Sequence, residues 1–220
     1  MAGRVLLLFA TLLFAIGLAE AGLRIIGFEF PQFHERDDTV GLTLRPHARG
    51  WYTEEGRAYV EVNSAGMRDI ERPRAKAPGT LRIAVIGDSY TEAIQVARED
   101  AFPARLEKHL GACAGSVEVL NFGVSGFGTA QQLLTLRKKV WDFAPDIVLL
   151  AFFPSNDVMN NSRELEPDKL RPFFVVQDGR LALDDSFRQQ RSYRILSSAP
   201  YRFLRQHSRV LGLALKARRG

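Results

Sequence analysis

The sequence has almost none of the residues that build disulfide frameworks or soft-metal sites. Its 220 residues include one cysteine, Cys113, and four histidines. One cysteine cannot form an internal disulfide, and a cysteine-ligated metal site is not available. The histidines are scattered and lack a metal-ligand spacing such as His-x-x-x-His. A disulfide-stabilised scaffold is therefore excluded, and we predict neither a metal nor a cofactor.

Acidic residues are absent from the end of the chain. Residues 188–220 contain nine Lys or Arg residues and no Asp or Glu. Residues 1–187 hold the other 21 basic residues and all 25 acidic ones, a net charge of −4, although the whole chain carries +5. The basic character is thus a property of the tail and does not indicate a nucleic-acid-binding domain. We predict no nucleic-acid partner.

Apolar residues are plentiful, at 46% of the chain, which is enough for one domain with a buried core plus attachments. The run Val5–Ala19 follows Arg4; it is short for a spanning helix of about 20 residues but suits a signal-peptide core. We favour an uncleaved anchor that continues through Gly22–Phe28, with Arg4 on the cytoplasmic side and the rest outside. The alternative is cleavage near Ala19–Ala21, which would release a secreted protein.

From Leu81 onward, apolar runs of strand length alternate with helical patterns. This alternation predicts an α/β fold with right-handed crossovers and a parallel sheet. The predicted elements, in chain order, are a strand at Ile83–Ile86, a helix at Glu99–Leu110 with Pro103 in its first turn, a strand at Val117–Phe122, a helix at Thr129–Phe143 and a third buried strand at Asp146–Phe153.

The pattern before and after this region is different. Residues 29–80 read as an extended connector in which Tyr59–Val62 alternates like a half-exposed strand. Phe173–Leu183 predicts a hairpin about the turn pair Asp178–Gly179, and Ser192–Ala217 predicts a basic, amphipathic helical tail. The expected division is an anchor or signal segment at 1–28, the connector at 29–80, the α/β domain at 81–185 and the tail at 186–220.

Each of the three predicted strands ends in a polar loop: Gly87–Ser89, Asn121–Gly126 and Pro154–Asp157. The carboxyl ends of parallel strands share one sheet edge, where ligands bind in open α/β sheets. Gly-Asp-Ser alone fits two interpretations equally well: a catalytic serine, or residues that only turn the chain and cap the next helix. Three such loops together suit acyl transfer at an ester, with a serine nucleophile and fixed donors for the oxyanion.

Together these motifs resemble the SGNH, or GDSL-type, hydrolases, a family of esterases, lipases and carbohydrate esterases. The resemblance covers about Leu81–Asn161 and implies a three-layer α/β/α, flavodoxin-like fold with a parallel sheet. We expect that fold to be incomplete here, since three of the usual five core strands are recognisable. The roles implied are nucleophile for Ser89, oxyanion hole for the backbone N–H groups of Ser89 and Gly126 and the Asn156 amide, and support for Asp88, Asp157 and Asn121.

Val62–Asp69 and the N-terminal anchor are similar to the membrane-attached bacterial branch of the family, which implies a catalytic domain in the periplasm or at the cell surface. Proline at residue 154 and alanine at residue 93 replace glycines that are common in the family. The family's base is a histidine with an aspartate three residues ahead of it, and no such pair occurs here. His207 remains as a candidate base, and we expect the chain to be part of a longer enzyme whose C-terminal half supplies the missing block.

Several alternatives stay open. The chain could be a non-catalytic, membrane-tethered protein that binds a glycan or a partner, or an O-acyltransferase acting on exported polysaccharide. For an enzyme of this type, the expected substrate is an ester or an acylated glycan. The tail either packs against the missing half or lies on an anionic membrane surface. Dinucleotide binding is disfavoured, because Gly123, Gly126 and Gly128 have the wrong order for the Gly-x-Gly-x-x-Gly fingerprint.

Overall fold

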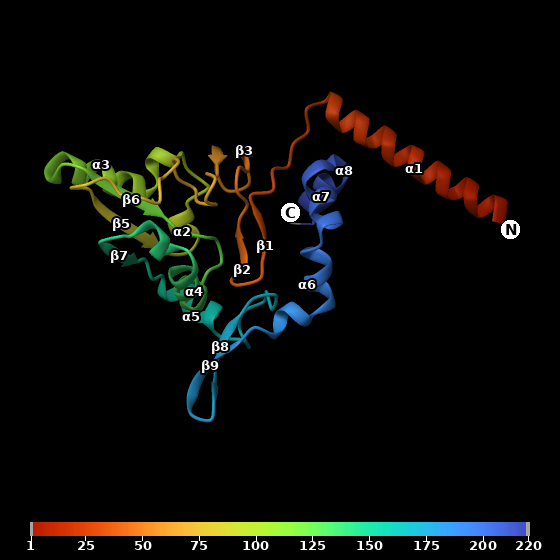
Figure 1. Cartoon of the computed structure of the whole chain (residues 1–220). Helices are drawn as coiled ribbons and strands as arrows, with labels where there is room; N and C mark the ends of the chain where they lie inside the picture. Colours follow the sequence, from red (N-terminus) through yellow and green to blue (C-terminus); the bar gives the residue numbers. More distant parts are fainter. Residues whose placement is uncertain (1, 219–220) are drawn as a thin grey trace. The chain divides into compact units, whose positions relative to one another are not determined.

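A computed structural model describes residues 2–218 (Figure 1). The chain divides into two compact units. The first, here called the terminal unit, comprises residues 2–32 and 198–218 of the described chain. The second, here called the sheet unit, is Phe33–Ser197. The predicted connector and the predicted α/β domain therefore lie in one unit, and most of the predicted tail lies with the N-terminal helix.

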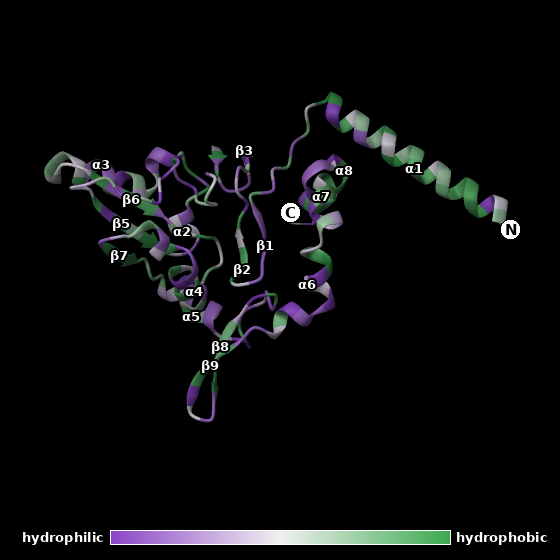
Figure 2. Ribbon diagram, viewed as in Figure 1, coloured by the Kyte–Doolittle hydropathy of each residue, from purple (hydrophilic) through white to green (hydrophobic). Residues whose placement is uncertain are grey.

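The terminal unit consists of three helices. They are α1 (Ala2–Ile25), α7 (Ala199–His207) and α8 (Arg209–Ala217). Helix α1 has 24 residues, none of them buried, and it is long and apolar enough to cross a membrane. Figure 2 shows it as hydrophobic along most of its length. At 1.5 Å per residue it is about 36 Å long, against a hydrocarbon core of about 30 Å.

The centre of the sheet unit is a parallel three-stranded sheet, which confirms the predicted mixed α/β class. Its strand order is β6-β5-β7, so that β5 lies in the middle. The strands are β5 (Leu81–Ile86), β6 (Val117–Asn121) and β7 (Ile147–Leu150). Ile83–Ile86 of β5 are all buried, as their solid apolar pattern predicts for a strand covered on both faces.

Helical segments follow each strand. They are α2 (Ser89–Glu92), the 3-10 helix η1 (Arg98–Asp100), α3 (Phe102–Ala114), α4 (Thr129–Lys138), the 3-10 helix η2 (Val140–Phe143) and α5 (Pro154–Asn161). Alternate residues of β5 face opposite sides of the sheet. Val85 lies in a core with Leu106 of α3, whereas Ala84 lies in a second core with Leu136 of α4 and Phe143 of η2. Helices therefore contribute to the cores on both faces.

The expectation of a buried third strand is wrong. Ile147 and Leu150 of β7 are each 47% exposed. The reason is position: β7 is an edge strand, paired only with β5 in the part of the chain that the structure describes. One of its faces also borders an open groove of about 690 Å³, lined among others by Val148, Leu150, Leu136 of α4 and Phe174. Apolar composition alone could not distinguish this edge strand from a central one.

The residues expected to form an extended connector fold and share a core with the α/β region. They fold into two antiparallel pairs, β1 (His34–Asp37) with β2 (Gly41–Leu44) and β3 (Arg49–Tyr52) with β4 (Ala58–Glu61). The strand β4 overlaps the alternation predicted at Tyr59–Val62. Buried Leu44 and Val60 pack with Phe127, which follows β6, and with Leu134 of α4. This segment is thus fixed to the carboxyl end of the sheet.

The rest of the sheet unit follows α5. The predicted hairpin is present as β8 (Phe173–Gln177) and β9 (Arg180–Asp184), joined by Asp178 and Gly179 with φ angles of 51° and 73°. Positive φ at both central positions is the geometry of a type I′ turn. The 3-10 helix η3 (Ser186–Gln189) and α6 (Arg191–Leu196) close the unit.

Arg82 of β5 provides a test of this fold. Its wholly buried guanidinium pairs with Glu118 of β6, with 2.6 Å between Nη2 and Oε2, and donates to the carbonyls of Phe143 and Arg74. Removing one partner of a buried pair leaves the remaining groups, here Glu118 and two backbone carbonyls, without their hydrogen-bond donor. Arg82→Leu is therefore expected to destabilise the sheet unit by about 3 kcal/mol. Urea unfolding followed by tryptophan fluorescence measures this, because both tryptophans, Trp51 and Trp141, lie in the sheet unit.

The matched control for that measurement is Arg137→Leu, since Arg137 is an exposed arginine on α4. It should shift stability by no more than about 0.5 kcal/mol. Equal effects of the two substitutions would contradict the structural role assigned to Arg82.

Candidate active site

Ser89 is the first residue of α2, directly beyond the carboxyl end of β5. Asp88 is the N-cap of this short helix, and its Oδ1 accepts the Tyr90 N–H at 3.0 Å. The Asp88 carbonyl accepts the N–H groups of Thr91 and Glu92. Asp88 therefore does cap the next helix, as the simpler interpretation of Gly-Asp-Ser predicts, and in doing so it fixes the position of Ser89.

A side-chain hydrogen bond links the loop after β5 to the segment after β7. Asn156, in the first turn of α5, donates from Nδ2 to Asp88 Oδ2 at 2.8 Å. The predicted loop Pro154–Asp157 is in fact the start of that helix, with Pro154 in its first turn, where proline is tolerated. A carboxamide carries two donor hydrogens, so the Asn156 amide retains one beyond the bond to Asp88.

The segment after β6 supplies Gly126. Gly126 has a φ angle of 77°, which favours glycine, and an added Cβ would meet nothing closer than Arg171 Nη2 at 3.7 Å. Its carbonyl accepts from that Nη2 at 2.5 Å, and the Arg171 guanidinium is paired with Glu166. The buried Arg171 therefore fixes the peptide group between Gly126 and Phe127.

Two backbone donors of this site are free. In the described chain, neither the Ser89 N–H nor the Gly126 N–H donates a hydrogen bond to the protein. The first N–H groups of a helix have no partner within it, which accounts for Ser89. With the second hydrogen of the Asn156 amide, the three predicted oxyanion-hole groups are available as donors.

Glu92, which the sequence analysis did not single out, lies one turn after Ser89 and is completely buried. Its Oε2 accepts the N–H of Ser125, and its Oε1 lies 2.8 Å from His34 Nε2. Burial raises the pKa of the Glu92 carboxyl, but His34 and Ser125 oppose this and hold it below its ordinary value of 4.5. A charged carboxylate thus connects α2 and β1 to the residue before Gly126.

Arg68, in the Val62–Asp69 motif, secures the other end of α2. Its Nη1 donates to the carbonyls of Glu92 and Ala93, at 3.0 and 2.5 Å, and its Nη2 donates to the Val96 carbonyl. Ala93 is left-handed, with a φ angle of 55°, and ends the helix. The buried guanidinium takes the place of solvent at these carbonyls.

Asn121 links α2 to the second loop from inside the protein. Its Nδ2 donates to the Thr91 carbonyl at 2.8 Å, and its Oδ1 accepts the Gly123 N–H at 2.9 Å. An added Cβ on Gly123 would lie 2.4 Å from the Glu92 nitrogen, so only glycine allows this approach of loop and helix. Asn121 thus has a bracing position consistent with the supporting role predicted for it.

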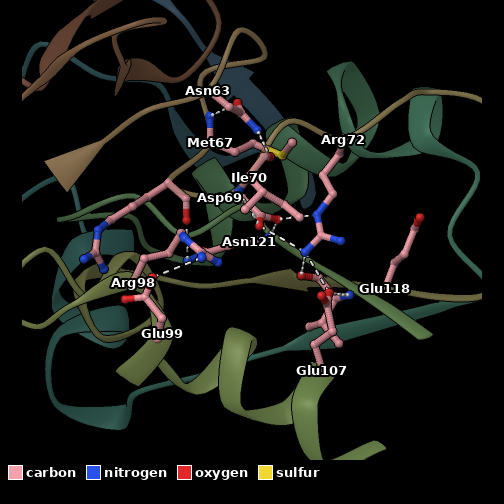
Figure 3. A network of polar contacts seen from close by, with 12 residues as sticks. Asn63, Met67, Asp69, Ile70, Arg72, Arg98, Glu99, Glu107, Glu118 and Asn121 are labelled. Carbon is pink, nitrogen blue, oxygen red and sulfur yellow. Dashed lines mark hydrogen bonds and ion pairs between the residues drawn. The ribbon is translucent and has the colours of Figure 1, made fainter. Parts of the chain in front are cut away.

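The network in Figure 3 joins Asn121 to the segment between β4 and β5 and to helix α3. Asp69 Oδ2 accepts the Asn121 N–H at 3.3 Å, and Arg72 Nη2 lies 3.1 Å from Asp69 Oδ1 and 2.7 Å from Glu107 Oε2. Burial raises the pKa of Asp69, although Arg72 opposes the shift. The Glu107 carboxylate in turn accepts the Val119 N–H of β6 at 2.6 Å.

Asp157 positions α5 rather than Ser89. Its Oδ2 accepts the Phe153 N–H at 2.7 Å, and its Oδ1 accepts from Gln132 of α4 at 3.3 Å. Burial raises the pKa of Asp157, and the charge of Asp88 raises it further. Both oxygens are engaged, so this side chain holds the helix that presents Asn156.

The histidines are placed as follows. Within the sheet unit, none of His34, His47 and His109 hydrogen-bonds the Ser89 hydroxyl. His207 lies in the terminal unit, where its Nδ1 pairs with the Phe203 carbonyl at 2.9 Å and its ring stacks on the Phe203 ring. Its role as the base stays a prediction. Among residues 2–218, no three His, Cys, Asp or Glu side chains are grouped as metal ligands would be.

Comparison with known proteins adds no further assignment. No protein-family model matches the chain, and no curated protein matches it.

The buried Glu92 carboxylate provides the test of this site's framework. Glu92→Gln removes the charge beside His34, so it is expected to destabilise the sheet unit by about 2 kcal/mol at pH 7. A carboxyl whose pKa is lowered by folding contributes stability above its ordinary pKa of 4.5, and this is lost as pH falls through the folded value. The stability difference between wild type and variant should therefore shrink below about pH 4.5.

Urea unfolding from pH 7 down to pH 4, monitored by tryptophan fluorescence, measures that difference. Glu99→Gln is the matched control, because Glu99 is an exposed carboxylate on η1. A difference between wild type and Glu92→Gln that stayed constant with pH would show that the buried carboxylate is not charged.

Proposed function

We propose that the chain is a membrane-anchored, serine-dependent ester hydrolase of the SGNH type, built on a flavodoxin-like three-layer α/β/α fold. The observation that carries the proposal is the hydrogen bond between Asn156 and Asp88, which brings the segment after β7 to the residue that precedes Ser89. In this proposal, the bond holds the neutral Asn156 amide at the residue next to the nucleophile. The free N–H groups of Ser89 and Gly126 are the other two oxyanion donors in this proposal.

In the proposed reaction, Ser89 Oγ attacks the ester carbonyl carbon and its proton passes to a general base. The carbonyl oxygen becomes an oxyanion that accepts from the N–H groups of Ser89 and Gly126 and from the Asn156 amide. The alcohol leaves with a proton, and water then attacks the acyl-serine to release the acid. Each such donor typically contributes about 10²–10³ in rate. A hydroxyl acceptor in place of water would make the same site an O-acyltransferase.

The proposed reaction needs a general base, and His34 does not supply it. His34 is engaged by the Glu92 carboxylate, so its Nε2 is not free to receive the serine proton. His207 is the candidate within the chain. The exposed edge of β7 supports a second source, since a strand added there would extend the sheet at the side that carries Asn156. A polypeptide carrying the missing Asp-x-x-His block would then deliver its histidine to Ser89.

The proposed location is outside the cytoplasm, with α1 as the anchor. Arg4 precedes the apolar stretch of α1, and a positive charge at this end favours a cytoplasmic N-terminus. The sheet unit would then face the periplasm or cell surface, where acylated glycans and other esters are its substrates.

Hydrolysis of a short-chain aryl ester by the full chain in detergent tests the proposal. Ser89→Ala is expected to reduce turnover at least 10³-fold, and Asn156→Ala about 10²-fold, because the first removes the nucleophile and the second one oxyanion donor. Ser155→Ala is the matched control, since Ser155 is an exposed serine beside Asn156, and it should leave the rate unchanged.

His207→Gln, assayed beside these variants, identifies the base: loss of turnover assigns it to His207. Turnover that survives Ser89→Ala would contradict the proposed nucleophile. No serine-dependent turnover from a chain with native tryptophan fluorescence would contradict catalysis by this chain alone, and would favour the binding protein or an enzyme completed at β7.

A further inference from the structure

A single carboxylate of α1 holds the N-terminus of α8. Glu20 accepts the backbone N–H groups of Arg209 and Val210, at 2.9 and 3.1 Å, and the Ser208 hydroxyl at 3.1 Å. Negative charge is favourable at a helix N-terminus, where the first N–H groups lack partners. One turn further along α1, Arg24 pairs with Glu20 and donates to the His207 carbonyl at 2.8 Å. The junction of α7 and α8 is thereby clamped to α1.

The clamp lies at a defined level of α1. Glu20 directly follows the apolar run Val5–Ala19 and is the first charged residue after Arg4. If α1 spans a bilayer, Glu20 marks the end of its hydrocarbon-embedded part. Helices α7 and α8 are then held at the boundary between hydrocarbon and headgroups.

Contacts with the segment after α1 keep both helices in place. Arg205 of α7 donates to Gln32 at 2.7 Å, and Arg209 of α8 pairs with Glu29 at 3.1 Å. Gly212 packs closely on Phe30, where an added Cβ would lie 3.4 Å from the Phe30 Cβ. The tail is thus a fixed part of the terminal unit.

The outward surface of these helices is both apolar and basic. Phe203 and Leu204 of α7 are 64% and 53% exposed, and Leu213 of α8 is 43% exposed. Residues 198–220 contain six Lys or Arg residues and no Asp or Glu. A helix with apolar side chains and only positive charge has the composition of one that lies in the headgroup region of an anionic membrane.

We propose that α7 and α8 form a platform that binds the surface of an anionic bilayer beside α1, with Phe203, Leu204 and Leu213 inserted at the boundary of headgroups and acyl chains. Arg202 and Arg218, both exposed, contact lipid phosphates. The proposal rests on the proposed membrane anchoring by α1. Its consequence is that the C-terminal end of α1 and the helices α7 and α8 are held together at one membrane surface.

Site-directed fluorescence on the full chain in vesicles tests the platform. Cys113 is the only cysteine and is exposed, so a Cys113→Ser background accepts one label at a time. An environment-sensitive dye is attached at Leu213→Cys or, as a second probe one turn further along the same helix, at Ala217→Cys. Val176→Cys on the exposed hairpin strand β8 serves as the reference label. Lipids brominated on their acyl chains report insertion by quenching.

We expect quenching of the labels at 213 and 217, but not of the label at 176, in vesicles that contain phosphatidylglycerol. Quenching should weaken in pure phosphatidylcholine and in high salt. Each basic residue at an anionic surface contributes about fivefold in partitioning, so Arg202→Gln with Arg218→Gln should also weaken it. The matched double variant Lys108→Gln with Arg137→Gln removes equal charge from exposed positions of the sheet unit and should have no effect.

Flotation of the vesicles separates failure of the anchor from failure of the platform. A chain that does not float with the vesicles would overturn both proposals. A chain that floats with unquenched labels at 213 and 217 would overturn the platform alone, and would mean that this face meets water or a protein. Quenching that is equal in neutral and anionic vesicles would overturn the role assigned to Arg202 and Arg218.

Discussion

The pairing of β5 with a parallel strand on each side determines the geometry of the candidate site. Val85 is in register with Asn121 of β6, and Ile86 with Leu150 of β7, so the three strands end at nearly the same level. The chain segments that follow them are therefore forced to meet at one edge. Ser89, Gly126 and Asn156 all belong to these segments, although they lie far apart in sequence.

Buried charged side chains then fix the segments that follow the three strands. The Glu92 carboxylate and the Arg68 guanidinium both hold the C-terminal end of α2, whose N-terminus is capped by Asp88. Asn121 ties that helix to the loop after β6. Burying such groups is costly unless each has partners, and here the partners are backbone atoms of the site itself. These buried contacts therefore hold the backbone around Ser89 and Gly126 in fixed positions. An oxyanion hole requires donors that are fixed in this way.

Local sequence signals predicted the three strands of the parallel sheet, the helices between them and the hairpin about Asp178, because each depends on periodicity or turn chemistry within a few residues. The exposure of β7 was not predictable, since an edge strand can be as apolar as a central one. Nor were the contacts of Glu92 and Arg68, which depend on residues 24 or more positions away. The packing of β1 to β4 on the sheet was missed for the same reason, as their short alternating strands resemble a connector.

The central claim is that Ser89 is a nucleophile facing fixed oxyanion donors. Intact-protein mass spectrometry after incubation with an alkyl fluorophosphonate tests it most directly, because Ser89 Oγ would form a bond to phosphorus as fluoride leaves, and the phosphoryl oxygen would occupy the oxyanion hole. We predict one adduct, located at Ser89 by peptide mapping and slower to form in Asn156→Ala. A folded chain that forms no adduct, or forms one at another serine, would contradict the account.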